Sequence, residues 1–266
     1  MTFAVHAAGV LAPGLASLAQ LRLACRGEAP IDPVPLALAA PPALPAAERR
    51  RASQAVRLTL ACIAQTLEGA PFDPAQLRSV FATDEGTGEV CQQMLEALAT
   101  TGQLSPLLFA NSVHNAPSGY FSIAWRNQEP ATVVSAGIES FACGLLCAVT
   151  DAMVTGQPVL LAAYDPAMAA PMDELLPVVH STAVALVLTA GDAAASAPVM
   201  GRFQLTLESP AQVAASPMPA WLPAAWHANS SARALIALAM LEESMGGAAH
   251  FDLGGQVLTL RRMEAP

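Results

Sequence analysis

The apolar residues of this chain alternate between short continuous runs and stretches with helical spacing. Continuous or β-branched runs are typical of strands, and of buried strands when both faces are apolar. Such runs occur at Thr2 to Leu11, Leu77 to Thr83, Ala131 to Ala136, Val159 to Ala163, Val184 to Leu188, Phe203 to Leu207 and Val257 to Arg261. Because helical segments separate many of these runs, the pattern predicts an α/β fold.

The helical segments are bounded by turn and loop signals. Helical spacing covers Leu15 to Cys25, Ala46 to about Leu67, Val90 to Thr100, Phe141 to Val154 and Ser231 to Glu243. Prolines recur too often between Ala29 and Pro45 for regular structure, so this segment is expected to be an extended loop. The apolar segment Phe141 to Val154 is shorter than the roughly 20 residues that a membrane span requires. We therefore expect a buried core helix there and no membrane span.

Composition narrows the classes of function. Hydrophobic residues make up 54% of the 266 residues and charged residues only 12%, so part of the apolar surface is expected to be covered by another subunit. All twelve positive charges are arginine, which excludes Schiff-base catalysis by lysine and the phosphate-binding lysine of P-loop proteins. A net charge of −9, with no basic run beyond Arg49 to Arg51, argues against a nucleic-acid partner.

The cysteines give no sign of a disulfide framework or of a metal site. The chain has five cysteines, an odd number, and no Cys-x-x-Cys spacing. No basic segment precedes the first apolar run, so that run is interpreted as a strand and not as a secretion signal. We expect a reduced, cytoplasmic protein that uses no cofactor and no metal ion.

Several segments, taken in order, resemble the β-ketoacyl synthase branch of the thiolase superfamily. Val5 to Gly14 resembles the first strand and turn of that family, and Ser79 to Gly88 resembles a strand that leads into a glycine-containing loop. The most specific match is Ser105 to Ala136, which resembles a loop, a buried helix, a turn and the strand before the nucleophile. The resemblance implies a thiolase-like layered αβαβα fold.

In catalytically active members of this family, that strand ends in a small-residue turn that carries a cysteine at the start of a buried helix. The helix dipole and backbone N–H groups favour the thiolate at such a position. This chain has Gly137-Ile138-Glu139-Ser140 there, and Glu139 aligns with the cysteine, although a shift of one residue would place Ile138 there. Cys143 and Cys147 lie one and two turns further along the helix. We therefore predict that no residue of this chain acts as the catalytic nucleophile.

The second half of the sequence is shorter than the family pattern. Active relatives need two histidines from a His-Gly-Thr-Gly type loop and an Asn-x-Gly-His type loop, and neither pattern occurs here. We expect a single domain over residues 1–266, in which 1–165 resembles the N-terminal half and 166–266 is a shortened C-terminal half. The turn Ala136 to Phe141 most resembles that of short chain-length factors, including those encoded with aryl-polyene synthases.

This resemblance implies a non-catalytic subunit of fatty-acid or polyketide biosynthesis. It would pair with an active ketosynthase and shape the far end of its acyl tunnel, with an acyl carrier protein as a further candidate partner. The candidate tunnel or interface residues are Phe109, Asn111, His114, Asn115, Tyr120, Phe121 and Phe141. Ordinary core packing is an equally good interpretation of the aromatic residues, and Glu139 is expected to be structural.

Two other functions are kept as alternatives. The chain could form a homodimer that binds acyl chains or carrier proteins without a ketosynthase. It could also be an acyltransferase or hydrolase that uses Ser140 or Ser118, although the sequence contains no Gly-x-Ser-x-Gly motif.

Overall fold

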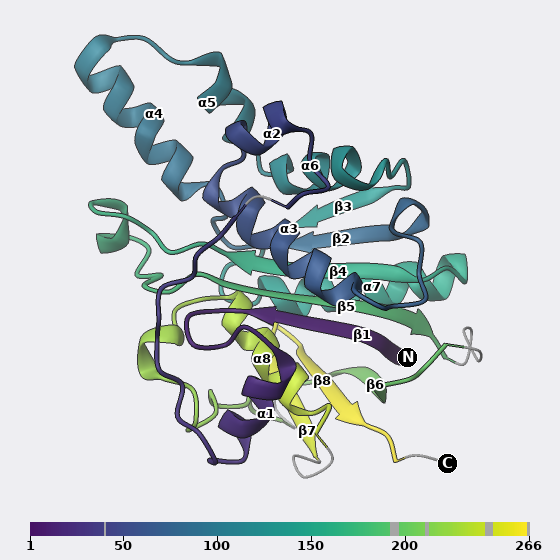
Figure 1. Cartoon of the computed structure of the whole chain (residues 1–266). Coiled ribbons are helices and arrows are strands. Elements are labelled where there is room, and N and C mark those ends of the chain that lie inside the picture. The colour runs from purple at the N-terminus through teal and green to yellow at the C-terminus, as the bar shows by residue number, and fades with distance from the viewer. Residues whose placement is uncertain (40, 192–196, 211–212, 243–246, 265–266) are drawn as a thin grey trace.

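A computed structural model describes residues 1–39, 41–191, 197–210, 213–242 and 247–264 (Figure 1). The main elements are β1 (Thr2–Leu11), α1 (Leu18–Cys25), α2 (Ala46–Arg51), α3 (Gln54–Leu67), β2 (Arg78–Ala82), α4 (Gly88–Thr101), α5 (Pro106–Asn111), α6 (Ala116–Trp125), β3 (Ala131–Val134), α7 (Ser140–Thr155), β4 (Val159–Asp165), β5 (Thr182–Ala190), β6 (Gly201–Glu208), η4 (Ser231–Arg233), α8 (Ala234–Ala239), β7 (Ala248–Asp252) and β8 (Val257–Arg262).

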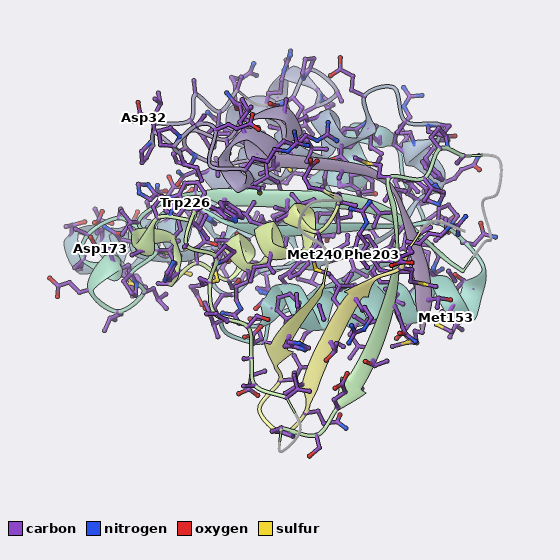
Figure 2. All side chains as sticks on the ribbon, turned by 90° about the horizontal axis from the view of Figure 1, so that it is seen from below. Asp32, Met153, Asp173, Phe203, Trp226 and Met240 are labelled. Carbon is purple, nitrogen blue, oxygen red and sulfur yellow. The ribbon has the colours of Figure 1, made fainter. Side chains whose placement is uncertain are left out.

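The described strands form one mixed sheet in the order β3-β2-β4-β5-β1-β6-β8-β7. Strands β3, β2 and β4 are parallel, and β5 then pairs antiparallel with β4 and with β1. The last three strands continue this sheet from β1, because β6 pairs antiparallel with β1. Seen from below, this β6-β8-β7 part turns away from the other strands (Figure 2). Strands β6, β8 and β7 thus extend the sheet that β1 to β5 form.

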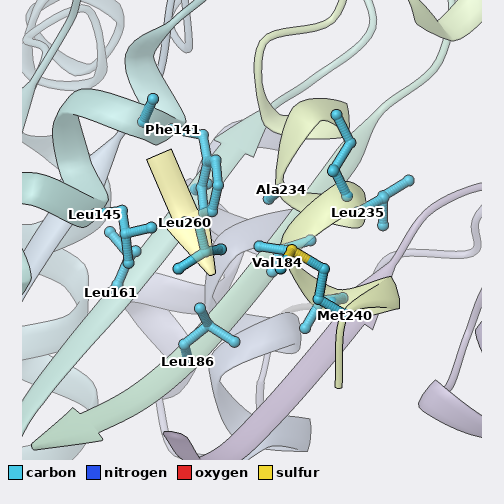
Figure 3. Close-up of a cluster of buried hydrophobic side chains, with 14 of the residues drawn as sticks. Phe141, Leu145, Leu161, Val184, Leu186, Ala234, Leu235, Met240 and Leu260 are labelled. Carbon is cyan, nitrogen blue, oxygen red and sulfur yellow. The ribbon is translucent and has the colours of Figure 1, made fainter. Parts of the chain in front are cut away.

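Helices cover both faces of the sheet, as Figure 1 shows. Residues of β4 alternate between the faces: Leu160 and Tyr164 pack in a cluster with α3 and α6, whereas Leu161 packs in a cluster with α7 and α8. Part of the second cluster is drawn in Figure 3, where Phe141 and Leu145 of α7 lie near Leu260 of β8. All residues of β4 are buried, as expected for a strand with both faces covered. The α/β prediction is confirmed.

The segment that was expected to form one helix from Ala46 to Leu67 is two helices. Ala52 is extended, and the Ser53 side chain accepts a hydrogen bond from Val56 N, which starts α3. The side-chain amide of Asn111 donates to Arg51 O at 3.2 Å, which satisfies a carbonyl at the end of α2. Arg49 to Arg51 therefore lie in the last turn of α2, where the helix dipole favours cations. A single helix from Ala46 to Leu67 would instead have placed these arginines in its first turns, where they oppose the helix dipole.

Two other predicted elements differ from the structure, and one strand was not predicted. Helix α1 begins at Leu18 and not at Leu15, because Ser17 is its N-cap. The predicted helix over 231–243 is the short η4 and α8, while Glu243 lies outside the described residues. Strand β7 was missed as a separate strand, because His250 and Asp252 interrupt its apolar pattern.

Helix α7 is only half covered. One face carries buried residues such as Leu145 and Ala148, but Met153 and Val154 are exposed. The 19 residues Gly137–Thr155 form the one described helix that is long and apolar enough to cross a membrane, and half of that stretch is buried in the protein. A core helix of a soluble protein passes the same test, so the finding agrees with packing against the sheet.

Candidate functional site

The turn before α7 is held by hydrogen bonds of Ser140. Ala136 N donates to the Ser140 hydroxyl at 2.9 Å, and this hydroxyl donates to Gly137 O at 2.6 Å. Gly137 has φ of +58°, a left-handed conformation that favours glycine, so the chain reverses there without strain. Ser140 is completely buried and its hydroxyl is committed to the turn. The turn therefore places Glu139, the residue before Ser140, at the N-cap of α7.

Glu139 forms a buried bidentate ion pair with Arg233 from η4. The Arg233 Nη2 to Glu139 Oε1 distance is 2.6 Å, and Nε donates to Oε2 at 3.1 Å. The two side chains are only 11% and 10% exposed, so the pair has little contact with water. Burial raises the pKa of the Glu139 carboxyl, and Arg233 partly offsets this increase. A carboxylate held in this way is a poor nucleophile and a poor proton donor.

Arg233 is positioned by a second buried carboxylate, that of Asp165 at the end of β4. Asp165 accepts hydrogen bonds from Ser230 Oγ at 2.5 Å and Ser231 N at 2.8 Å, which fixes the start of η4. It also accepts from Thr83 Oγ1 and Asp84 N, both at 2.8 Å. Burial raises the pKa of Asp165, and these four donors counteract the increase. Asp165 thus joins the loop after β2 to η4.

The two cysteines of α7 lack the surroundings of a reactive thiol. Cys143 and Cys147 are both partly buried, one and two turns beyond the start of the helix. Burial raises the pKa of both thiols, with added effects from Glu139 on Cys143 and from Asp151 on Cys147. A raised pKa disfavours the thiolate, which is the reactive form. Both cysteines are therefore in surroundings unlike those of a catalytic thiol.

The serine alternative has no supporting geometry either. Ser118 Oγ donates to Asn115 O at 2.9 Å, so its hydroxyl, like that of Ser140, is occupied by backbone. No hydrogen bond joins a histidine to Ser118, Ser140 or Glu139 within the described parts of the chain. His6 and His250 instead contact threonine hydroxyls at 2.9 Å and 3.0 Å. The candidate site offers no nucleophile paired with a base.

Two of the predicted tunnel aromatics lie in the core. Phe121 is 1% exposed and packs edge-on against Phe81 at 5.9 Å between ring centroids, on the α3 side of the sheet. Phe141 is also 1% exposed and packs edge-on against Phe251 of β7 at 5.8 Å, on the opposite face. The sheet separates the two rings, so they do not line one common pocket.

The remaining predicted residues lie on α5, on α6 and in the segment that joins them. Phe109 is 61% exposed, whereas Asn111 is buried and donates to Arg51 O and Leu107 O. Tyr120 is partly buried, and burial raises the pKa of its hydroxyl. His114 is partly buried and Asn115 is exposed just before α6. The structure gathers these residues beside α5 but separates them from Glu139 along the chain and across the sheet.

Sequence reasoning missed Arg233 and Asp165. Neither residue lies in a recognisable motif, and their roles depend on contacts over 94 and 65 positions along the chain. A lone acidic residue at the end of an otherwise apolar strand was the available signal for Asp165. No cluster of three or more His, Cys, Asp or Glu side chains that could hold a metal ion occurs among the residues that the structure describes.

The fold and site define an α/β protein with a buried Glu139–Arg233 ion pair at the start of helix α7. The sequence model of the β-ketoacyl synthase N-terminal domain matches residues 25–241, which is most of the chain. The chain therefore belongs to the β-ketoacyl synthase family. No curated protein is similar enough in sequence to give a significant match.

Solved structures of this family share the fold over almost the whole chain. A chain of the ketosynthase ApeO in complex with its chain length factor ApeC from Xenorhabdus doucetiae superposes with a TM-score of 0.74 and 24% identity, covering 98% of this chain and 100% of that one. A chain of AntDE:AntF, a type II acyl carrier protein in complex with its ketosynthase bound to the hexaketide, gives 0.77 and 11%, with 99% of both chains covered. The ishigamide ketosynthase/chain length factor gives 0.71 and 15%, covering 99% and 100%. The predicted thiolase-like fold is confirmed.

Proposed function

We propose that this chain is a non-catalytic chain-length factor, which pairs with an active β-ketoacyl-acyl-carrier-protein synthase and limits the growth of its acyl chain. The observation that carries the proposal is the buried Glu139–Arg233 pair at the start of α7, the position that the sequence resemblance aligns with the family's nucleophile. An aryl-polyene product and a cytoplasmic location belong to the same proposal. The relatives with a ketosynthase and a chain length factor in their titles support it by fold.

The edge strand β3 is the proposed pairing surface. It ends the sheet, is exposed along its first residues, and has a described partner strand on one side only, β2. The carbonyls of Pro130 and Val134 accept hydrogen bonds from β2, so main-chain groups of alternate residues, including those of Val133, face outward. An uncovered edge of this kind can add the same strand of a second subunit across a two-fold axis.

The arm formed by α4, α5 and the loop between them carries a second surface that a partner subunit would cover. In Figure 1 the arm extends beyond the sheet. It exposes large apolar side chains that a stable monomer would rarely leave in water. They are Leu95, Leu98, Leu104, Leu107 and Phe109, each at least 40% exposed. We propose that this arm packs against the ketosynthase, with Phe109 placed to reach its acyl tunnel.

Changing the size of Phe109 should change the chain length of the product. Phe109→Ala should leave stability nearly unchanged because the ring is 61% exposed, and it should lengthen the acyl chain if the ring stops growth. Phe121→Ala, in contrast, should cost about 3–5 kcal/mol of stability because this ring is buried in the core. Mass spectrometry of the products and urea unfolding of both variants would measure these effects. Unchanged products from Phe109→Ala and Phe109→Trp would remove Phe109 from the proposed tunnel.

The alternative function, a homodimer that binds acyl chains or carrier proteins, differs from this proposal because its partner subunit is a second copy of this chain and not a ketosynthase. Coexpression with a ketosynthase encoded beside this chain, followed by light scattering on a sizing column, should give a complex with one copy of each subunit. Condensation should require both subunits. A stable homodimer of this chain that ignores the ketosynthase would instead support the scaffold function.

A further inference from the structure

Helix α5 carries a single polar side chain, that of Asn111, and this side chain is buried. The helix has the sequence PLLFAN, and Asn111 is its only buried residue. The exposed fraction of Asn111 is 5%, whereas that of Phe109 is 61%. Successive residues of an α-helix are rotated by about 100°, so positions 109 and 111 lie on nearly opposite sides of α5. Holding Asn111 inward therefore keeps Phe109 outward.

The Asn111 amide joins α5 to the end of α2. Asn111 Nδ2 donates to Leu107 O at 3.1 Å, which fixes the side chain on its own helix. The same nitrogen donates to Arg51 O at 3.2 Å and so crosses to α2, which lies beside α5 in Figure 1. The other side chains of α5 are apolar, so none of them can form a directed contact of this kind. Asn111 is thus the hydrogen-bonding anchor of α5.

The end of α2 is itself held in place by α3. Ala52, the residue after Arg51, is extended and buried. Its carbonyl accepts a hydrogen bond from Arg57 Nε of α3 at 3.0 Å. Helix α3 in turn packs in the core cluster on this face of the sheet. A chain of contacts therefore runs from the core through α3 and the end of α2 to Asn111.

Helix α6 reaches the same point through Tyr120. Burial raises the pKa of the Tyr120 hydroxyl and Glu48 of α2 adds to the increase, while a hydrogen bond with the Asn111 side chain and the charge of Arg51 oppose it. These influences show that the hydroxyl lies close to the Asn111 amide and to α2. Asn111 therefore occupies the point where α2, α5 and α6 meet.

Stability alone does not explain an amide at this position. The Asn111 Oδ1 atom is buried and has no hydrogen-bond partner among the described residues. A buried acceptor without a partner is destabilising, and leucine, whose side chain has the same number and branching of heavy atoms, would remove it. The net contribution of the amide to stability is therefore small. What the amide adds over leucine is a fixed direction for α5.

We propose that Asn111 is a positioning residue for the length of the product, which holds α5 against α2 so that Phe109 keeps its place at the end of the partner's acyl tunnel. The inference rests on the proposed function, in which Phe109 stops chain growth. Asn111 itself does not contact the acyl chain. Without its amide, α5 is held by apolar contacts only, and Phe109 can move away from the growing chain.

The test measures the products of the two-subunit complex by mass spectrometry. The net strength of one hydrogen bond corresponds to roughly a fivefold shift between held and released α5. The ratio of longer products to the main wild-type product should rise by about this factor in Asn111→Leu and in Asn111→Ala, which both remove the donor but differ in volume. The double variant Phe109→Ala/Asn111→Leu should give the same products as Phe109→Ala, because Asn111 acts through Phe109.

Thr66→Val is the matched control for the loss of a buried hydrogen bond. The Thr66 hydroxyl is buried and donates to Cys62 O at 2.8 Å, at the end of α3 that lies away from α2. This variant should leave the product distribution unchanged. A sizing column and urea unfolding would establish that each variant is folded and assembled. Hydrogen exchange of the assembled complex should become faster in α5 of Asn111→Leu and stay unchanged in α3.

Wild-type products from a folded and assembled Asn111→Leu complex, with longer products from Phe109→Ala, would overturn the positioning role and leave the proposed function standing. A product distribution of the double variant that differs from that of Phe109→Ala would also overturn it, because Asn111 would then act by another route. Equally long products from Thr66→Val, or failure of both Asn111 variants to assemble, would have the same meaning. Unchanged products from Phe109→Ala would instead count against the proposed function, and this inference would fall with it.

Discussion

Glu139→Ala is expected to lower the free energy of unfolding by about 3–5 kcal/mol, because it leaves the Arg233 guanidinium buried without its partner. Arg233 is 11% exposed and its bidentate contact with Glu139 is the principal compensation for its charge. The remaining neighbours, Met218 Sδ at 4.0 Å and the Phe251 ring at 6.0 Å, cannot replace a carboxylate. Urea unfolding of the isolated chain or of the complex would measure the loss.

Two further variants test whether the loss of stability in Glu139→Ala comes from the buried, unpaired charge of Arg233. Glu242→Ala removes a carboxylate that pairs with Arg22 and Arg26, but those arginines are 50% and 49% exposed and can be hydrated, so the loss should be clearly smaller. The double variant Glu139→Leu/Arg233→Met should recover much of the stability, because an apolar pair can replace a buried ion pair. Product formation per folded complex should stay largely intact in each. Loss of condensation in a fully folded Glu139→Gln complex would contradict a structural role.

Val133→Pro is expected to prevent assembly with the ketosynthase while leaving this chain folded. Proline removes the main-chain N–H of Val133, which faces away from β2 according to the alternation of hydrogen bonds along β3. A strand added at this edge would lose a hydrogen bond and would meet the proline ring. Sizing of the coexpressed subunits should show separate species, and condensation should fall to background.

The matched control at this position is Val133→Ala, which keeps the N–H and shortens the side chain. It should assemble with the ketosynthase and retain most of the condensing activity. Circular dichroism and urea unfolding of Val133→Pro would establish that the chain is folded. A normal two-subunit complex formed by a folded Val133→Pro variant would exclude the β3 edge as the pairing surface.

Most strands could be predicted from the sequence because continuous apolar runs are typical of buried strands. β4 and β5 are buried along almost their whole length, and apolar runs of this kind leave little choice of structure. The break between α2 and α3 was not predictable, because Arg51 and Ala52 are both good helix formers. The contact that ends α2 comes from Asn111, which lies 60 positions away. Long-range contacts of this kind leave no periodic signal.

In the candidate site, too, local features could be predicted from the sequence, whereas features that depend on long-range contacts could not. The alignment of Glu139 with the family's cysteine rests on local motifs and stays a prediction, while the structure shows that the Gly137 to Ser140 turn places Glu139 at the N-cap of α7. Arg233 could not be identified, because its pairing depends on how Asp165 holds η4 against the first half of the chain. Phe109 and Phe121 are both aromatic and 12 positions apart, yet one is exposed and the other is in the core. Only the packing of α5 and α6 distinguishes them.

The central claim is that this chain has no acyl-accepting residue and works through its partner. Intact-protein mass spectrometry of the two-subunit complex, quenched during turnover with an acyl carrier protein, would locate the acyl group directly. The account predicts an acyl thioester on the ketosynthase alone and an unmodified mass for this chain. An acyl group on this chain, at Cys143 or at Ser140 for example, would contradict the account.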